Sequence, residues 1–235
     1  MTIAVQPPAY FPGLAYTALI HHVDHFILAD TFRFRRQSFQ NRSKLRNAQG
    51  GHWITIPLFG RPEGAALHTV DIETGGRWQE KHWRSFLYDY RSTMYFDFFQ
   101  EPLQAFYDHT WTSLADCTAR SVTLQADLYG LDTPLHRATD LDGNPATPSA
   151  IVDTLGADVL LALPDDEVSP TDAPTVRRFH HDPPSYHQNF GGFEPGTTGM
   201  DLFFNYGPEA PSYLAQGVEV EPLASEAADE GEAPS

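Results

Sequence analysis

The chain has 235 residues, of which 41% are hydrophobic and 13% aromatic, and its formal net charge is −16. This composition is that of a globular protein with a sizeable core, so disorder is expected only locally. The acidic balance excludes general nucleic-acid binding, which needs an extended basic face. There is no apolar run long enough to span a bilayer and no signal-peptide pattern at the start, so we expect a cytoplasmic protein. The single cysteine, Cys117, excludes an internal disulfide and a cysteine-built zinc site.

The start of the chain predicts a βαβ unit. A strand over residues 2–6 precedes a proline-rich loop, a helix over residues 14–23 and an apolar run at residues 25–29. Because a helix joins the two strands, we expect them to lie parallel in one sheet.

Further strands are predicted over residues 31–36, 53–57, 69–72 and 158–163. In the first of these, Phe32 and Phe34 alternate with Arg33 and Arg35, which places the two arginines on one face.

Helical periodicity follows the two glycines at residues 75–76. It predicts helices over residues 78–90, 95–107 and 113–129, the last ended by Gly130, and shorter helices at residues 149–155 and from Asp201 to a stop at Gly207. The fold class is therefore α/β, with a mainly parallel sheet flanked by helices in a single domain over residues 1–217. Residues 218–235 contain six acids and no basic residue, so we expect an acidic disordered tail.

A basic segment stands out in this acidic protein. Residues 31–62 contain no Asp or Glu and seven basic residues, which are Arg33, Arg35, Arg36, Arg42, Lys44, Arg46 and Arg61. An isolated cationic segment indicates an anionic ligand, and the planar guanidinium suits phosphate or carboxylate. The alternative is a solvated strand and loop whose charges keep the surface wet.

The chain resembles the WbqC-like protein family, known chiefly from bacterial polysaccharide and O-antigen gene clusters. The opening block resembles the family motif at Gln6, Pro7, Tyr10, Pro12, Tyr16, Asp24, Asp30, residues 39–42, Trp53, Thr55 and Pro57. The closing block resembles it at Tyr186, Gln188, Phe193, Pro195, Asp201, Leu202, Phe204, Asn205 and Gly207. The chain differs from the family pattern at residues 161–175, where acids and prolines replace a glycine-rich stretch, and at Gly13 and Thr198.

The resemblance implies a transferase that acts on a nucleotide-linked or phosphorylated sugar, with acyl or aminoacyl transfer as one form of the reaction. The alternative is a non-catalytic protein of the same pathway that binds or assembles sugars or nucleotides. A nucleotidyltransferase is a third reading, although the chain lacks the paired histidines of such enzymes. No cofactor and no nucleic-acid partner are expected, and a homodimer is left open.

The candidate ligand-binding residues come from both blocks and the basic segment: Gln6, Tyr10, Arg33, Arg35, Gln40, Asn41, Arg42, Lys44, Tyr186, Gln188 and Asn205. We expect the guanidinium groups to converge on one recess that also receives Tyr186 and Gln188. The loop after the first strand, with Gln6 and Tyr10, would meet the ligand at the carboxyl edge of the sheet, or would be only a rigid turn.

Three residues are candidates for proton transfer: Asp30, His187 and Asp201. Asp30 is equally well interpreted as an ion-pair partner of Arg33 or Arg42, and Asp201 as a helix-capping carboxylate. His187 is alternatively an exposed or structural histidine.

No metal site is expected. His21, His22, Asp24 and His25 are close in sequence, but His25 belongs to the second strand, so it does not share a helix face with His21. Cys117 lies in a helical pattern and is expected to be a small packed residue.

Overall fold

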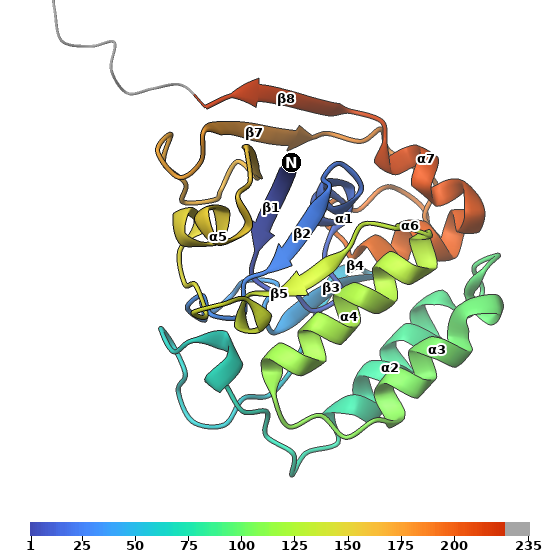
Figure 1. Cartoon of the computed structure of the whole chain (residues 1–235). Coiled ribbons are helices and arrows are strands. Elements are labelled where there is room, and N and C mark those ends of the chain that lie inside the picture. The colour runs from blue at the N-terminus through green and yellow to red at the C-terminus, as the bar shows by residue number, and fades with distance from the viewer. Residues whose placement is uncertain (224–235) are drawn as a thin grey trace, which may run out of the picture.

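The centre of the molecule is a six-stranded sheet, shown by the computed structural model in Figure 1. Its strands, in spatial order, are β5 (Leu135–Arg137), β2 (His25–Leu28), β1 (Thr2–Gln6), β6 (Val159–Ala162), β7 (Thr175–His181) and β8 (Val218–Pro222). Every neighbouring pair is parallel except β7 with β8, which is antiparallel. The structure describes residues 1–223. The prediction of a mainly parallel α/β sheet flanked by helices is confirmed.

Strand β1 lies inside the sheet because both of its faces are apolar. Ile3 and Val5 pack on one side, in a cluster with Ile151 of α5 (Pro148–Leu155). Ala4 faces the other side, in the larger cluster that includes Leu19 of α1 (Leu14–His21). The alternation of a buried strand thus fixes two layers of helices around one sheet.

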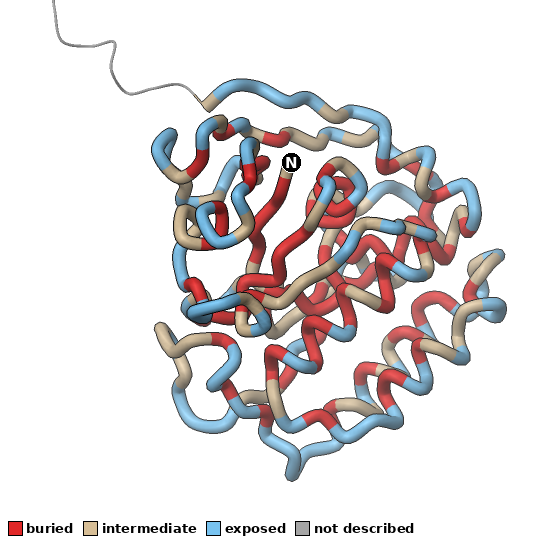
Figure 2. Tube along the Cα trace, viewed as in Figure 1, coloured by how far each residue is buried: buried red, intermediate tan, exposed pale blue. Residues whose placement is uncertain are grey.

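The larger layer contains α1 and five more helices: α2 (Trp78–Tyr90), α3 (Phe96–Asp108), α4 (Leu114–Tyr129), α6 (Gly199–Tyr206) and α7 (Ala210–Leu214). In Figure 1, α5 lies across the sheet from them, and Figure 2 shows that the central strands and inner helix faces are buried. Helix α4 begins where Ser113 Oγ accepts the Asp116 N–H at 3.3 Å. It ends at Gly130, whose φ of +64° is the left-handed conformation expected past a helix end.

The predicted strand at residues 31–36 is wrong. Its backbone pairs with a short return segment, through Phe34 N to the Ala65 carbonyl at 2.7 Å and an isolated bridge from Arg33 to Ala66. The chain then turns at Gln37, where φ is +59°. Since no strand of the sheet lies alongside, the local alternation of aromatics and arginines produces no ladder.

The predicted strand at residues 69–72 is also wrong. Leu67–Thr69 form a 3-10 turn, η1, and Asp71 and Ile72 bridge two different partners, Ser113 and Leu58. The strand predicted at residues 53–57 is found as β4 (Gly50–Thr55), which forms a separate antiparallel hairpin with β3 (Arg42–Asn47). Strands β3, β5 and β7 were not predicted, nor were the 3-10 turns η2 (Ala138–Asp140) and η3 (Gly207–Glu209).

The prediction of a disordered tail is wrong for Val218–Pro222, which form β8. Its residues are mostly exposed, and β8 is held by backbone pairing to β7, from Arg177↔Pro222 to His181↔Val218. Composition alone misses this strand because the open edge of β7 supplies the hydrogen bonds. Residues 224–235 of the predicted tail lie outside the described residues.

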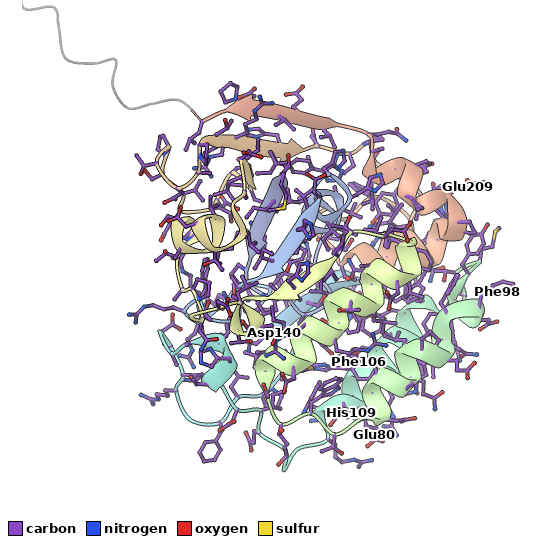
Figure 3. All side chains as sticks on the ribbon, viewed as in Figure 1. Glu80, Phe98, Phe106, His109, Asp140 and Glu209 are labelled. Atoms are coloured by element: carbon purple, nitrogen blue, oxygen red, sulfur yellow. The ribbon has the colours of Figure 1, made fainter. Side chains whose placement is uncertain are left out.

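Phe98 projects from the start of α3 away from the body of the molecule (Figure 3) and is 75% exposed.

Within residues 1–223, none of the helices combines the length and apolarity needed to cross a bilayer. Cys117 is buried in α4 as expected, and burial raises the pKa of its thiol well above its ordinary value.

Candidate functional site

The carboxyl ends of β1, β2 and β5 point to one edge of the sheet, at the lower left of Figure 1. A cleft of about 640 Å³ opens at this edge, where parallel α/β sheets bind their ligands. We name it the arginine cleft; its polar lining consists of Thr31, Arg33, Arg35, Gln40, Thr147, Asp165, Asp166 and Glu167.

Arg33 and Arg35 both line this cleft. Arg33 Nη1 donates to the Gly64 carbonyl at 3.1 Å. Arg35 Nη2 lies 2.8 Å from Glu167 Oε2, but these side chains are 60% and 78% exposed. Such an exposed pair is worth only about 0–1 kcal/mol, so a ligand phosphate can displace Glu167 from Arg35. Gln40 Oε1 accepts the Arg35 N–H at 2.7 Å, which fixes the backbone at this point.

Asp166, on the loop after β6, is a third charged residue in the lining of this cleft. Its Oδ2 accepts the Leu163 N–H at 2.6 Å and also a hydrogen bond from Gln6 Nε2. Burial raises the pKa of Asp166 from 3.8 to about 6, against the opposing effects of these two hydrogen bonds and of Arg178. Arg178 Nη1 donates to the carbonyls of Leu163 and Asp166 at 2.8 and 2.9 Å and so holds the loop. A carboxylate with this pKa is ionised at pH 7 and is basic enough to accept a proton.

A second hollow, of about 410 Å³, adjoins the arginine cleft. We name it the apolar cavity; its lining is Pro12, Gly13, Leu14, Ala15, Tyr16, Phe39, Leu163, His181, Asp182, Pro183, Tyr186, Phe193, Pro195, Gly196 and Thr197. The two hollows share a boundary, because the Tyr16 hydroxyl donates to the carbonyl of Pro7, a cleft residue, at 3.1 Å. The bond from Leu163 N to Asp166 crosses the same boundary.

The closing block forms a buried polar network behind the apolar cavity. Asp201 has no exposed surface, and its Oδ2 accepts the Tyr186 hydroxyl at 2.6 Å and Gln188 Nε2 at 2.9 Å. Burial raises the pKa of Asp201. Asp201 does not cap α6, since Thr198 Oγ1 accepts the Met200 N–H at 3.3 Å. Sequence reasoning thus selected three residues that the fold brings into contact.

Asp30 is fully buried and accepts three hydrogen bonds: from Arg137 Nε at 2.7 Å, Thr139 N at 3.0 Å and Thr139 Oγ1 at 2.7 Å. This geometry favours the ion-pair interpretation over a catalytic base. The partner is Arg137, not Arg33 or Arg42 as expected.

Tyr10 is also fully buried and lines neither hollow. Its hydroxyl lies 2.9 Å from His82 Nδ1 and 2.6 Å from the Tyr107 hydroxyl. Burial raises the pKa of Tyr10 well above its ordinary value. These contacts fit the rigid-turn interpretation of the loop better than direct ligand contact.

The other basic residues lie elsewhere. Arg36, Asn41 and Arg42 line a third hollow, of about 390 Å³, beside the β3–β4 hairpin. There the Arg42 guanidinium stacks 4.0 Å from the centroid of the Trp53 ring, and Asn41 Nδ2 donates to the Ile56 carbonyl at 3.1 Å.

Lys44 is engaged by the closing block. Its Nζ lies 2.5 Å from Glu194 Oε1 and donates to the Pro195 carbonyl at 3.0 Å. The expectation that the guanidinium groups converge on one recess with Tyr186 and Gln188 is therefore wrong, since the basic residues divide between separate hollows.

His187 and Asn205 lie apart from both main hollows. His187 is exposed, and its backbone N–H donates to the Tyr206 hydroxyl at 3.0 Å. Asn205 Nδ2 donates to the backbone carbonyl of Asp201 at 2.7 Å, so its amide does not meet the Asp201 carboxylate. Among residues 1–223, no cluster of His, Cys, Asp or Glu side chains could hold a metal ion.

Sequence reasoning missed Asp166 and the adjacent Asp165 and Glu167, which it treated only as parts of an acidic loop. The sequence did contain a signal for these residues, because the three acids follow closely after a buried strand that ends at Ala162. The carboxyl ends of parallel strands meet at one edge, so this position alone indicates the arginine cleft.

Comparisons with known proteins cover nearly the whole chain. The uncharacterized protein Rv1507c of Mycobacterium tuberculosis is 26% identical over 223 residues, which cover 90% of this chain and 96% of that protein. No solved structure matches the chain. The model of the WbqC-like protein family matches residues 6–213, and the chain therefore belongs to the WbqC-like protein family.

Proposed function

We propose that the protein is a transferase that acts on a nucleotide-linked or phosphorylated sugar in polysaccharide or O-antigen biosynthesis. The observation that carries the proposal is the arginine cleft: Arg33, Arg35 and Asp166 line one hollow at the carboxyl edge of the sheet. Membership of the WbqC-like family supports the sugar pathway.

Each group has a distinct part in this proposal. Arg33 and Arg35 bind the phosphate oxygens, with Glu167 displaced from Arg35. A hydroxyl of the bound sugar attacks the carbonyl carbon of an acyl or aminoacyl donor, and the bond from that carbon to the donor's carrier breaks, so that the carrier leaves with the electron pair. The hydroxyl proton passes to the carboxylate of Asp166, whose pKa of about 6 suits this step near neutral pH. Gln6 holds that carboxylate in place.

Binding is tested by titrating UDP-, GDP- and dTDP-hexoses into the protein in a calorimeter. The variants Arg33→Gln and Arg35→Gln should each weaken binding about ten- to a hundredfold, since hydrogen bonds to charged groups contribute about 1.5–3 kcal/mol. Arg61→Gln is the matched control, because Arg61 is exposed and belongs to the same basic segment but lines none of the three hollows. Equal affinity in all variants would refute a phosphate site at this position.

Turnover is tested by mass spectrometry of the bound sugar after acyl or aminoacyl donors are added. Asp166→Asn should abolish product and keep the affinity for the sugar nucleotide. Tight binding by the wild type without product from any donor would favour the non-catalytic alternative. Product formed at the wild-type rate by Asp166→Asn would remove Asp166 from the mechanism.

A further inference from the structure

The apolar cavity has the lining of a ligand site rather than of ordinary surface. Leu14, Ala15 and Tyr16 of α1 form one wall, and Phe39, Leu163 and Phe193 form the others. Phe193 is 41% exposed although it borders a concave hollow. Small-molecule sites are concave and mainly apolar, with few polar groups.

The few polar groups at this cavity are largely engaged within the protein. The Thr197 hydroxyl lies 3.4 Å from the Tyr186 hydroxyl, and Asp182 stands exposed at the rim. His181 is the exception: both of its ring nitrogens are buried without a hydrogen-bond partner among the described residues. Burial lowers the pKa of His181, so the ring is neutral at pH 7. Apart from His181, the lining offers few free donors or acceptors. A bare sugar, whose hydroxyls need several partners, therefore fits it poorly, whereas an aliphatic chain fits most of it well.

The cavity adjoins the arginine cleft. The Tyr16–Pro7 and Leu163–Asp166 hydrogen bonds form the shared boundary, and Phe39 of the cavity directly precedes Gln40 of the cleft. A ligand that crosses this boundary would place a phosphate at the arginines and an apolar group beyond Tyr16.

We propose that the apolar cavity is a subsite for an aliphatic chain on the same ligand whose phosphate occupies the arginine cleft. This inference rests on the proposed function and assigns its ligand class: a phosphate ester that carries a hydrocarbon chain.

The test uses ethyl, butyl, hexyl and octyl phosphate as calorimetric probes, with inorganic phosphate as the reference. Affinity should rise two- to fourfold for each added methylene until the cavity is full, since a buried methylene is worth about 0.8 kcal/mol. Affinity that does not change with chain length would overturn the proposal.

Ala15→Phe fills the cavity and should abolish the dependence on chain length while leaving inorganic phosphate binding unchanged. Ala105→Phe is the matched control, the same change at an exposed position of α3 that lines neither the cavity nor the cleft. Phe193→Ala provides a second variant that does not crowd the fold and should reduce the dependence, with Phe98→Ala as its control. Unchanged chain-length dependence in both cavity variants would place the chain elsewhere.

Two further arms separate this inference from the proposed function. Arg33→Gln should weaken all phosphate esters equally and keep the dependence on chain length. If no phosphate binds, n-alkanols of the same lengths still test the cavity. A rise in alkanol affinity with chain length would support the chain subsite even though the phosphate site had failed. No rise in alkanol affinity would overturn the chain subsite as well.

Discussion

Replacing Asp166 by asparagine should make the protein more stable at alkaline pH. Burial raises the pKa of this carboxyl from 3.8 to about 6, so between these values the folded protein holds a proton that the unfolded chain has lost. Stability therefore falls as pH rises through this window, and above it the ionised carboxylate destabilises the fold. Asparagine carries no charge and can still accept the Leu163 N–H through its side-chain oxygen.

The size of the effect follows from the same pKa values. A difference of about 2 pKa units corresponds to about 3 kcal/mol, which is an upper bound because Asp166 is partly exposed to solvent. We expect Asp166→Asn to raise the free energy of unfolding by about 1–3 kcal/mol near pH 8 and to change it little near pH 4.

Urea unfolding of wild type and variant at both pH values measures this difference. Asp165→Asn is the control, since this neighbouring acid is exposed and its replacement should change stability by less than about 0.5 kcal/mol. A loss of stability in Asp166→Asn at pH 8, or a gain that is equal at both pH values, would refute the reasoning. A gain in stability combined with a loss of turnover would mark Asp166 as a group retained for function.

Three other changes act on the fold. Gly217→Ala should cost more than about 3 kcal/mol in urea unfolding, because φ is +68° and the new Cβ would lie 1.9 Å from the Asp182 carbonyl oxygen. Asp30→Asn should cost about 2 kcal/mol by the same assay, since it breaks a pair with Arg137, which is 30% exposed. Burial lowers the pKa of His82 from 6.5 to about 4, so stability falls as pH drops through that window, and His82→Phe should remove this part of the acid sensitivity measured by thermal unfolding.

Each of these changes has a matched control. Gly143→Ala, at φ +78° with no atom within 4 Å of the new Cβ, should cost only about 1–2 kcal/mol. Asp140→Asn and His109→Phe alter exposed residues, both labelled in Figure 3, and should change stability by less than about 0.5 kcal/mol. A target variant that behaves like its control would contradict the packing or ion pair on which its prediction depends.

Several elements were predictable because their signal is local. The run at residues 2–6 and the run at residues 25–29 are apolar on both faces, and they became the neighbouring parallel strands β1 and β2. Helix α4 has the 3.6-residue period and its glycine stop at Gly130, both of which act within a few residues. The opening and closing motifs likewise identified the family before any contact was known.

Elements whose stability comes from a distant neighbour were not predictable in this way. Strand β8 is mostly exposed and forms because β7 offers an open edge, while the alternating residues 31–36 find no such edge and remain irregular.

The sequence by itself determined the fold class, the family and the presence of an isolated basic segment, because composition and period are properties of neighbouring residues. Only the tertiary structure decided which charges meet. It paired Asp30 with Arg137 and separated Arg42 from Arg33. It also placed Asp166 in the same cleft as Arg33 and Arg35, from which it is more than a hundred residues distant in the chain. Burial then raised the pKa of Asp166, and burial depends on every layer of the fold at once.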